Sequence, residues 1–304
     1  MEKGPHFHHS PMAHPPWSSV LRMCSLVLLL TGALLTSAYS SNGSEVPASY
    51  QPLVDRLSKD GFNSEFLCGL FTDPRAEAIP AMMTISLTSG EARDFYNQFL
   101  TPESIRLAKK FKHENSKLLN QAEKQFHVEK EVIVAILLVE SRFGENIGRW
   151  RIVPTLASMA IIDSPENLQS NYLTLRENDP EVSYDTIEML SRKRGNWAYS
   201  ELKCFLTIVQ SERIDPLEVR GSYAGALGMA QFLPSSYLAF ADKKSSLDEW
   251  LLSKEGAVFS IGNYLKVHGW RKNLSPERKK RVLWYYNHSK PYVETILQIA
   301  RRIK

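Results

Sequence analysis

One long apolar stretch constrains the fold of this chain more than any other, and it runs from Glu129 to Gly144. Every position from Val132 to Val139 is apolar, so a helix formed here is buried on all of its faces. The charged residues 129–131 suit the first turn of such a helix, and Gly144 is a typical stop signal. A strand is the alternative, but the length of the run and its Ala and Leu content favour a helix.

Glu140 stands where the apolar run stops. Removal from water raises the pKa of a carboxyl group, and a general acid must be protonated near neutral pH. The alternative is a structural glutamate that lies in water or pairs with an arginine, since ion pairs also perturb carboxylates. Arg142 is the nearest arginine, but it would face elsewhere on a helix. The helix alone therefore leaves both roles open for Glu140.

Composition describes a globular protein of one large or two modest domains. The chain has 304 residues, of which 43% are hydrophobic, and a net charge of +4. Such a small basic excess is compatible with an anionic partner but indicates no nucleic acid. We expect a monomer.

Residues 1–48 read as a targeting segment and not as part of the fold. Residues 23–35 are almost all apolar and are followed by the small residues Thr36, Ser37, Ala38 and Ser40, which is the layout of a secretory signal. The run is short for a membrane span, so export to the periplasm with cleavage is the first interpretation. Membrane association through residues 23–38 is the alternative. Cys24 precedes the apolar run, where a lipidated cysteine would not be placed.

Export would leave two cysteines, Cys68 and Cys204, in the mature chain. In an oxidising compartment they could form one disulfide, or they could remain buried thiols. The sequence does not choose between these two states, because pairing depends on a distance.

The fold class is mainly α, because no alternating strand pattern extends over any length. Thr101 and Pro102 are typical of a helix start, and that helix could continue to Phe126. Residues 49–304 are expected to form one domain. Its other expected helices cover residues 51–60, 64–70, 154–162 and 201–210, with a polar insertion at about 164–196 that has a surface helix of its own.

Two further motifs bear on function. Residues 221–237, GSYAGALGMAQFLPSSY, contain three glycines within eight residues, which predicts a tightly turning backbone that closely approaches something. The spacing matches neither GxGxxG nor GxxxxGK, so a phosphate loop is rejected. Residues 284–287, WYYN, place aromatic rings beside an amide, which is how proteins hold sugars, although such a cluster alone is more often core.

Taken together, these motifs resemble the lytic murein transglycosylase B family, which is glycoside hydrolase family 103. The resemblance covers about residues 50–304. It rests on VESRFG (139–144), DPLEVRGSYAGALGMAQFLPSSY (215–237), IGNYLKVHGW (261–270) and YYNHSKPYVETIL (285–297). It implies a lysozyme-like, mostly α catalytic domain, with additional helical segments around a long glycan-binding groove.

The resemblance also implies the reaction, which is cleavage of the β-1,4 bond between N-acetylmuramic acid and N-acetylglucosamine in peptidoglycan. Ordinary glycosidases use two carboxylates, whereas these motifs offer one. Glu140 would protonate the leaving oxygen and then act as a base toward the 6-hydroxyl of the muramic acid, which closes a 1,6-anhydro ring. A non-catalytic peptidoglycan-binding scaffold and a hydrolytic lysozyme are the alternatives.

By position in the family motifs, the resemblance assigns the remaining site residues. The expected substrate-binding residues are Ser222, Gln231, Tyr286, Asn287 and Tyr292. Ser141 and Arg142 are expected to support the site from behind, and no cofactor is expected. Residues 241–251 lack the alternating oxygen ligands of the calcium loop that many family members carry, so we expect no metal there.

Overall fold

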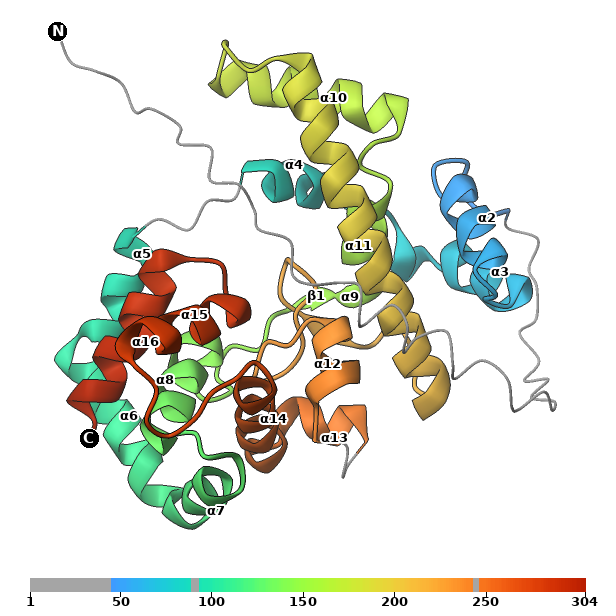
Figure 1. The fold of residues 1–304 in the computed structure, drawn as a ribbon. Helices are drawn as coiled ribbons and strands as arrows, with labels where there is room; N and C mark the ends of the chain where they lie inside the picture. The colour runs from blue at the N-terminus through green and yellow to red at the C-terminus, as the bar shows by residue number, and fades with distance from the viewer. Residues whose placement is uncertain (1–44, 89–92, 243–245) are drawn as a thin grey trace, which may run out of the picture.

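The computed structural model describes residues 45–88, 93–242 and 246–304, and these residues are mostly helical (Figure 1). The predicted fold class is confirmed. The predicted targeting segment, including residues 23–38, lies almost wholly outside the described residues. The α-helices are α2 Gln51–Lys59, α3 Ser64–Thr72, α4 Pro80–Thr88, α5 Arg93–Asn97, α6 Pro102–Glu114, α7 Ser116–Phe126, α8 Lys130–Ser141, α9 Ile152–Ala160, α10 Pro165–Asn178, α11 Tyr184–Glu212, α12 Pro234–Phe240, α13 Leu247–Leu252, α14 Lys254–Val267, α15 Pro276–Tyr286 and α16 Lys290–Arg302.

The predicted central helix is α8, and a strand is excluded for this run. Its residues from Glu131 to Leu138 are all buried, and the helix packs against α6, α14 and α16. It begins after Glu129, whose carboxylate accepts hydrogen bonds from the Trp270 indole at 2.7 Å and from Lys279 at 2.6 Å. The segment after α14 and helix α15 therefore hold the start of α8 in place.

The end of α8 differs from the prediction, because the helix stops at Ser141 and not at Gly144. Three successive residues then adopt left-handed conformations, with φ values of 48° at Arg142, 64° at Phe143 and 95° at Gly144. Left-handed backbone is costly for residues other than glycine, so packing must maintain it. The Phe143 ring stacks on Phe111 of α6 at 4.1 Å, which accounts for part of that packing.

Two other helix boundaries also differ. The helix starts after Thr101 as predicted, with the Thr101 hydroxyl accepting from the Ser104 amide at 3.2 Å. It breaks at Asn115 into α6 and α7, because the Asn115 side chain donates to the Phe111 carbonyl at 2.9 Å and competes with the helix ladder.

The helix predicted at 201–210 is instead part of α11, whose 29 residues begin within the polar insertion expected at about 164–196 and continue without a break.

One small residue, Gly195, allows α11 to pass close to the end of α9. Gly195 is buried, and a Cβ added there would lie 3.3 Å from the Ile162 side chain and 3.5 Å from the Ala160 carbonyl oxygen. The helix can therefore cross the end of α9 at close range while its outer face stays polar. In Figure 1, α11 runs from α10 past α9 toward α12.

A two-stranded antiparallel pair joins the loop after α8 to the glycine-rich loop. Strand β1, Trp150–Arg151, pairs with β2, Arg220–Gly221, with Trp150 opposite Gly221. Gly148 lies so close to this pair that an added Cβ would be 2.0 Å from the Gly221 carbonyl. The two motif-bearing loops thus meet backbone to backbone.

Two further findings concern the possible disulfide between Cys68 and Cys204 and the possibility of a membrane-spanning helix. Cys68 on α3 is exposed, and no disulfide joins it to Cys204 on α11. Among the described residues, no helix combines the length and the apolar character that crossing a bilayer requires.

Candidate active site

Glu140 lies in the last turn of α8, where the buried part of the helix ends. It is half-buried, and its Oε1 accepts a hydrogen bond of 2.7 Å from the hydroxyl of Tyr292. Tyr292 is 1% exposed and lies in the first turn of α16, which the Ser289 hydroxyl caps by accepting from the Tyr292 amide. The structure therefore brings together the predicted acid and one of its predicted partners.

A second tyrosine lies parallel to the first. The rings of Tyr286 and Tyr292 are 6.3 Å apart with a 9° angle between their planes, and the Tyr286 hydroxyl donates to the Ala230 carbonyl at 2.6 Å. Burial raises the pKa of both phenols well above the usual range, and the charge of Glu140 raises it further. Both phenol groups therefore stay protonated and act as hydrogen-bond donors.

Ser141 connects the end of α8 to the glycine-rich loop. It is buried, and its hydroxyl donates to the Met229 carbonyl at 2.8 Å while accepting from the Gly144 amide at 3.0 Å. Together, Ser141 and Tyr286 hold two consecutive carbonyls of the loop, at Met229 and Ala230.

Gln231 follows directly, and it has a left-handed backbone with φ of 48°. Its side-chain Nε2 donates to the carbonyls of Gly228 at 2.8 Å and Ile147 at 3.2 Å. Among the described residues, no donor contacts its Oε1. The residue therefore closes the loop with one end of its amide and keeps the other end available as an acceptor.

Ser222 lies at the start of the same loop. Its hydroxyl accepts from the amides of Ala224 at 3.2 Å and Ala226 at 3.0 Å. These bonds fix the turn that Gly225, with φ of 81°, requires. Within the described part of the chain, no acceptor takes the Ser222 hydroxyl proton, so the hydroxyl retains its capacity as a donor.

The other two predicted residues are Arg142 and Asn287. Arg142 is left-handed and its guanidinium lies 3.6 Å from the Glu145 carboxylate. Asn287 ends α15 in an extended conformation and passes the chain to α16, with its carbonyl accepting from the Ser289 amide at 2.8 Å. Asn287 thus lies on the connection between Tyr286 and Tyr292.

Two residues near the site carried no sequence signal of their own. Tyr96 on α5 is 2% exposed and its ring meets Tyr292 edge-on at 6.1 Å. Glu201 on α11 is completely buried and accepts from the Ser235 amide at 2.9 Å and the Ser235 hydroxyl at 2.8 Å. Desolvation raises the pKa of Glu201 to about 7. In the sequence, Glu201 differs from its surroundings only in being an acidic residue on an otherwise apolar helix face, which does not indicate a role.

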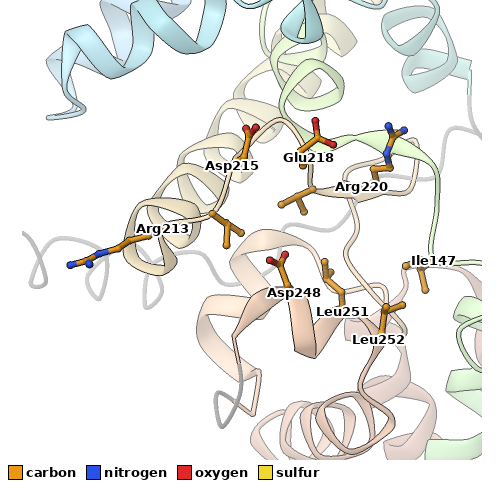
Figure 2. Close-up of a pocket in the computed structure, with 10 residues that line it drawn as sticks. Ile147, Arg213, Asp215, Glu218, Arg220, Asp248, Leu251 and Leu252 are labelled. Atoms are coloured by element: carbon orange, nitrogen blue, oxygen red, sulfur yellow. The ribbon is translucent and has the colours of Figure 1, made fainter. Parts of the chain in front are cut away.

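A hollow of about 510 Å³ lies behind the glycine-rich loop, between the end of α11, the segment 213–220 and α13 (Figure 2). Glu140 does not line it. Ile147 and Leu251 do, and their carbonyls accept from the Gln231 side chain and the Met229 amide. The hollow therefore lies against the glycine-rich loop and is separate from the residues that surround Glu140. Among the described residues, no cluster of His, Cys, Asp and Glu could hold a metal ion.

A mostly helical domain whose buried central helix carries a glutamate in its last turn, next to a glycine-rich loop, is typical of the lysozyme-like class of fold. Within this class, the chain belongs to the transglycosylase SLT domain family, which matches residues 46–279. The family expected from the motifs is confirmed.

Individual relatives agree with this assignment. The membrane-bound lytic murein transglycosylase B of Escherichia coli K12 is 32% identical over 181 residues, which are 59% of this chain and 42% of the relative. The chain thus spans less than half of the length of that relative. The soluble lytic transglycosylase SltB1 of Pseudomonas aeruginosa has a TM-score of 0.65 at 23% identity, over 83% of this chain and 97% of that one.

A third relative is the Pseudomonas aeruginosa SltB3 structure, solved in complex with NAG-anhNAM-pentapeptide. It has a TM-score of 0.62 at 17% identity, over 83% of this chain and 79% of that one. The two solved structures establish the shared fold.

Proposed function

We propose that this chain is a peptidoglycan lytic transglycosylase, which cleaves the β-1,4 bond between N-acetylmuramic acid and N-acetylglucosamine and leaves 1,6-anhydromuramic ends. The observation that carries the proposal is the 2.7 Å hydrogen bond from Tyr292 to Glu140, at the end of a buried helix. Family membership and the anhydro-sugar fragment bound by SltB3 support it.

In the first step, Glu140 gives its proton to the glycosidic oxygen, and the bond from that oxygen to C1 of the muramic acid breaks. The oxygen of the 2-acetamido group bonds to C1 and forms an oxazolinium-like intermediate. N-acetylglucosamine leaves with a free 4-hydroxyl. With Tyr292 donating to Oε1, the acid proton belongs on Oε2.

In the second step, the ionised Glu140 takes the proton of the 6-hydroxyl. The 6-oxygen then bonds to C1, the bond from C1 to the acetamido oxygen breaks, and the 1,6-anhydro ring closes. The hydrogen bond from Tyr292 stabilises the ionised carboxylate that acts as this base. One carboxylate therefore serves twice, and no water enters as a nucleophile.

The remaining site residues bind the glycan strand. Ser222 would donate its hydroxyl proton to the substrate near the acetamido group, and Gln231 would accept an amide proton through Oε1. Tyr286 and Asn287 complete the wall of the cleft with Tyr292. Ser141 and Arg142 fix the end of α8, as the bond from Ser141 to the Met229 carbonyl suggests.

We also propose that the protein is exported and acts in the periplasm. The apolar run at 23–35 supports export, and the relative named membrane-bound supports an attachment through residues 23–38. Protease treatment of intact spheroplasts should degrade the protein. Protection from the protease would contradict export.

Digestion of purified peptidoglycan with the full chain tests the activity. Soluble fragments that are lighter by one water than reducing-end fragments, measured by mass spectrometry, support the proposal. Reducing ends would identify a hydrolytic lysozyme, and the absence of soluble fragments would identify a binding scaffold; either outcome would overturn it.

A further inference from the structure

Positive charge is concentrated at the C-terminal end of the sequence. Residues 266–304 contain eleven lysines and arginines against two acidic residues, a net charge of +9, whereas the other 265 residues carry a net −5. The modest total of +4 therefore hides a strongly basic segment, which consists of the end of α14, the turn after it, α15 and α16.

The cations of α15 separate into one inward and three outward side chains. Lys279 points inward, pairs with Glu129 at 2.6 Å and lies 5.6 Å from the Trp270 ring. Arg278, Lys280 and Arg281 are exposed. Within residues 45–88, 93–242 and 246–304, none of these three makes an ion pair or a side-chain hydrogen bond.

Helix stability accounts in part for Lys280 and Arg281 but not for Arg278. Arg278 and Arg281 are three residues apart, so their like charges repel on one helix face. Arg278 also lies in the first turn, where the helix dipole disfavours positive charge. Glu277 lies three and four residues before Lys280 and Arg281 and offsets part of this repulsion, but it leaves the cost of Arg278 in place.

Apolar groups accompany the cations. Trp284 is half-buried, stacks edge-on with His288 at 5.5 Å, and follows Lys280 by four residues, so the two share a helix face. Val267, at the end of α14, is 60% exposed and directly follows the exposed Lys266.

The ends of α14 and α15 lie side by side. The His268 ring lies 5.3 Å from the Tyr285 ring, and the Tyr264 hydroxyl donates to the Tyr285 carbonyl at 2.6 Å. These contacts join the apolar and basic groups into one surface, which we name the basic face. It consists of Val267, Arg278, Lys280, Arg281 and Trp284. Lys266 is left out, because its ammonium donates to the Gln125 carbonyl at 3.4 Å and lies 5.8 Å from the Phe126 ring.

We propose that the basic face docks on an anionic lipid surface. Unpaired cations are attracted to anionic headgroups, and tryptophan favours the membrane interface. Val267 distinguishes this partner from a carboxylated glycan polymer, which offers no apolar phase to receive an aliphatic side chain. Tyr286 points from the other side of α15 into the protein, toward Ala230, so the basic face and the Glu140 site use different sides of α15.

Vesicle sedimentation of the full chain tests the docking. The measured quantity is the ratio of partition coefficients between vesicles of phosphatidylcholine with added phosphatidylglycerol and vesicles of phosphatidylcholine alone. The predicted segment at 23–35 contributes to both compositions and largely cancels in this ratio. The combined variant Arg278→Gln, Lys280→Gln and Arg281→Gln should lower the ratio about tenfold or more.

A matched control removes the same charge from exposed lysines elsewhere, namely Lys59→Gln, Lys109→Gln and Lys254→Gln. The ratio for this control should change by less than about threefold, because screening limits attraction between distant charges. Equal losses in both variants would overturn the proposal. So would a basic-face variant that keeps its vesicle binding but no longer sediments with purified peptidoglycan, because the partner would then be the polymer.

Val267→Ser provides an independent check on the apolar part of the face. It should lower partition onto the anionic vesicles about threefold, since a side chain that enters the lipid interface loses its burial. An unchanged partition coefficient would contradict insertion. None of these measurements depends on turnover, so their outcome is separate from that of the proposed activity.

Discussion

At the scale of single residues, the hydroxyl of Tyr292 is the group that holds Glu140. Tyr292→Phe removes this donor but keeps the ring packed against Tyr286 and Tyr96. Because a hydrogen bond to a charged group contributes about 1.5–3 kcal/mol, kcat should fall roughly ten- to hundredfold. Release of soluble fragments under saturating substrate measures the change.

Tyr286→Phe is the matched control, because it removes the hydrogen bond to the Ala230 carbonyl and leaves the donor on Glu140 in place. Its effect on kcat should be smaller than that of Tyr292→Phe. Full activity of Tyr292→Phe would show that the acid does not depend on this contact.

The sequence predicted residues that stand in recognisable motifs and missed those that do not. Glu140 was visible because an apolar run ends there, and Tyr292 because of the YYNHSKPY motif. Tyr96 could not be found, since one aromatic residue in a five-residue helix has no pattern. Of the three left-handed positions after α8, only Gly144 was visible, because packing imposes the conformation of Arg142 and Phe143.

At the scale of elements, the contact between Glu201 of α11 and Ser235 of α12 holds the end of the glycine-rich loop. The pKa of Glu201 is raised from 4.5 to about 7 by desolvation. The native state therefore binds a proton more tightly than the unfolded state. Stability from this group is fully present below pH 4.5 and is lost as the pH rises through 7.

Urea unfolding at several pH values measures this effect. Between pH 4.5 and 7.5, Glu201 should lower the free energy of unfolding by up to roughly 3 kcal/mol. The Glu201→Gln variant should lack this component, while the exposed control Glu249→Gln should keep it. Identical pH profiles for wild type and Glu201→Gln would contradict the assignment.

The presence of most helices was predictable, but their boundaries were less so, and two of them show why. Asn115 divides the helix expected from Thr101 to Phe126, and its signal is weak because asparagine also occurs inside helices. The length of α11 depends on how closely Gly195 passes Ile162, which is a tertiary contact and leaves no periodicity in the sequence.

At the scale of the whole molecule, the two motif-bearing loops meet where Gly148 contacts Gly221. Gly148→Ala should unfold at lower urea concentration and lose activity, because the added Cβ would lie 2.0 Å from the Gly221 backbone. Gly61→Ala is the matched control. Its φ of 97° resembles the 91° of Gly148, but a Cβ there meets nothing within 4 Å.

Both alanine variants therefore carry a similar conformational cost, and the difference between their free energies of unfolding isolates the clash. We expect the Gly148 variant to be less stable than the control by about 1–3 kcal/mol. Equal free energies of unfolding for the two variants would show that the backbone contact between the loops relaxes to accept the added Cβ.

The most direct test of the whole account is the activity of Glu140→Gln on purified peptidoglycan, measured beside its binding to the same material. The amide keeps the shape of the side chain and has no acid proton to give. We predict that anhydro fragments disappear from the digest while sedimentation with peptidoglycan stays near the wild-type level. Undiminished release of anhydro fragments by this variant would contradict the account.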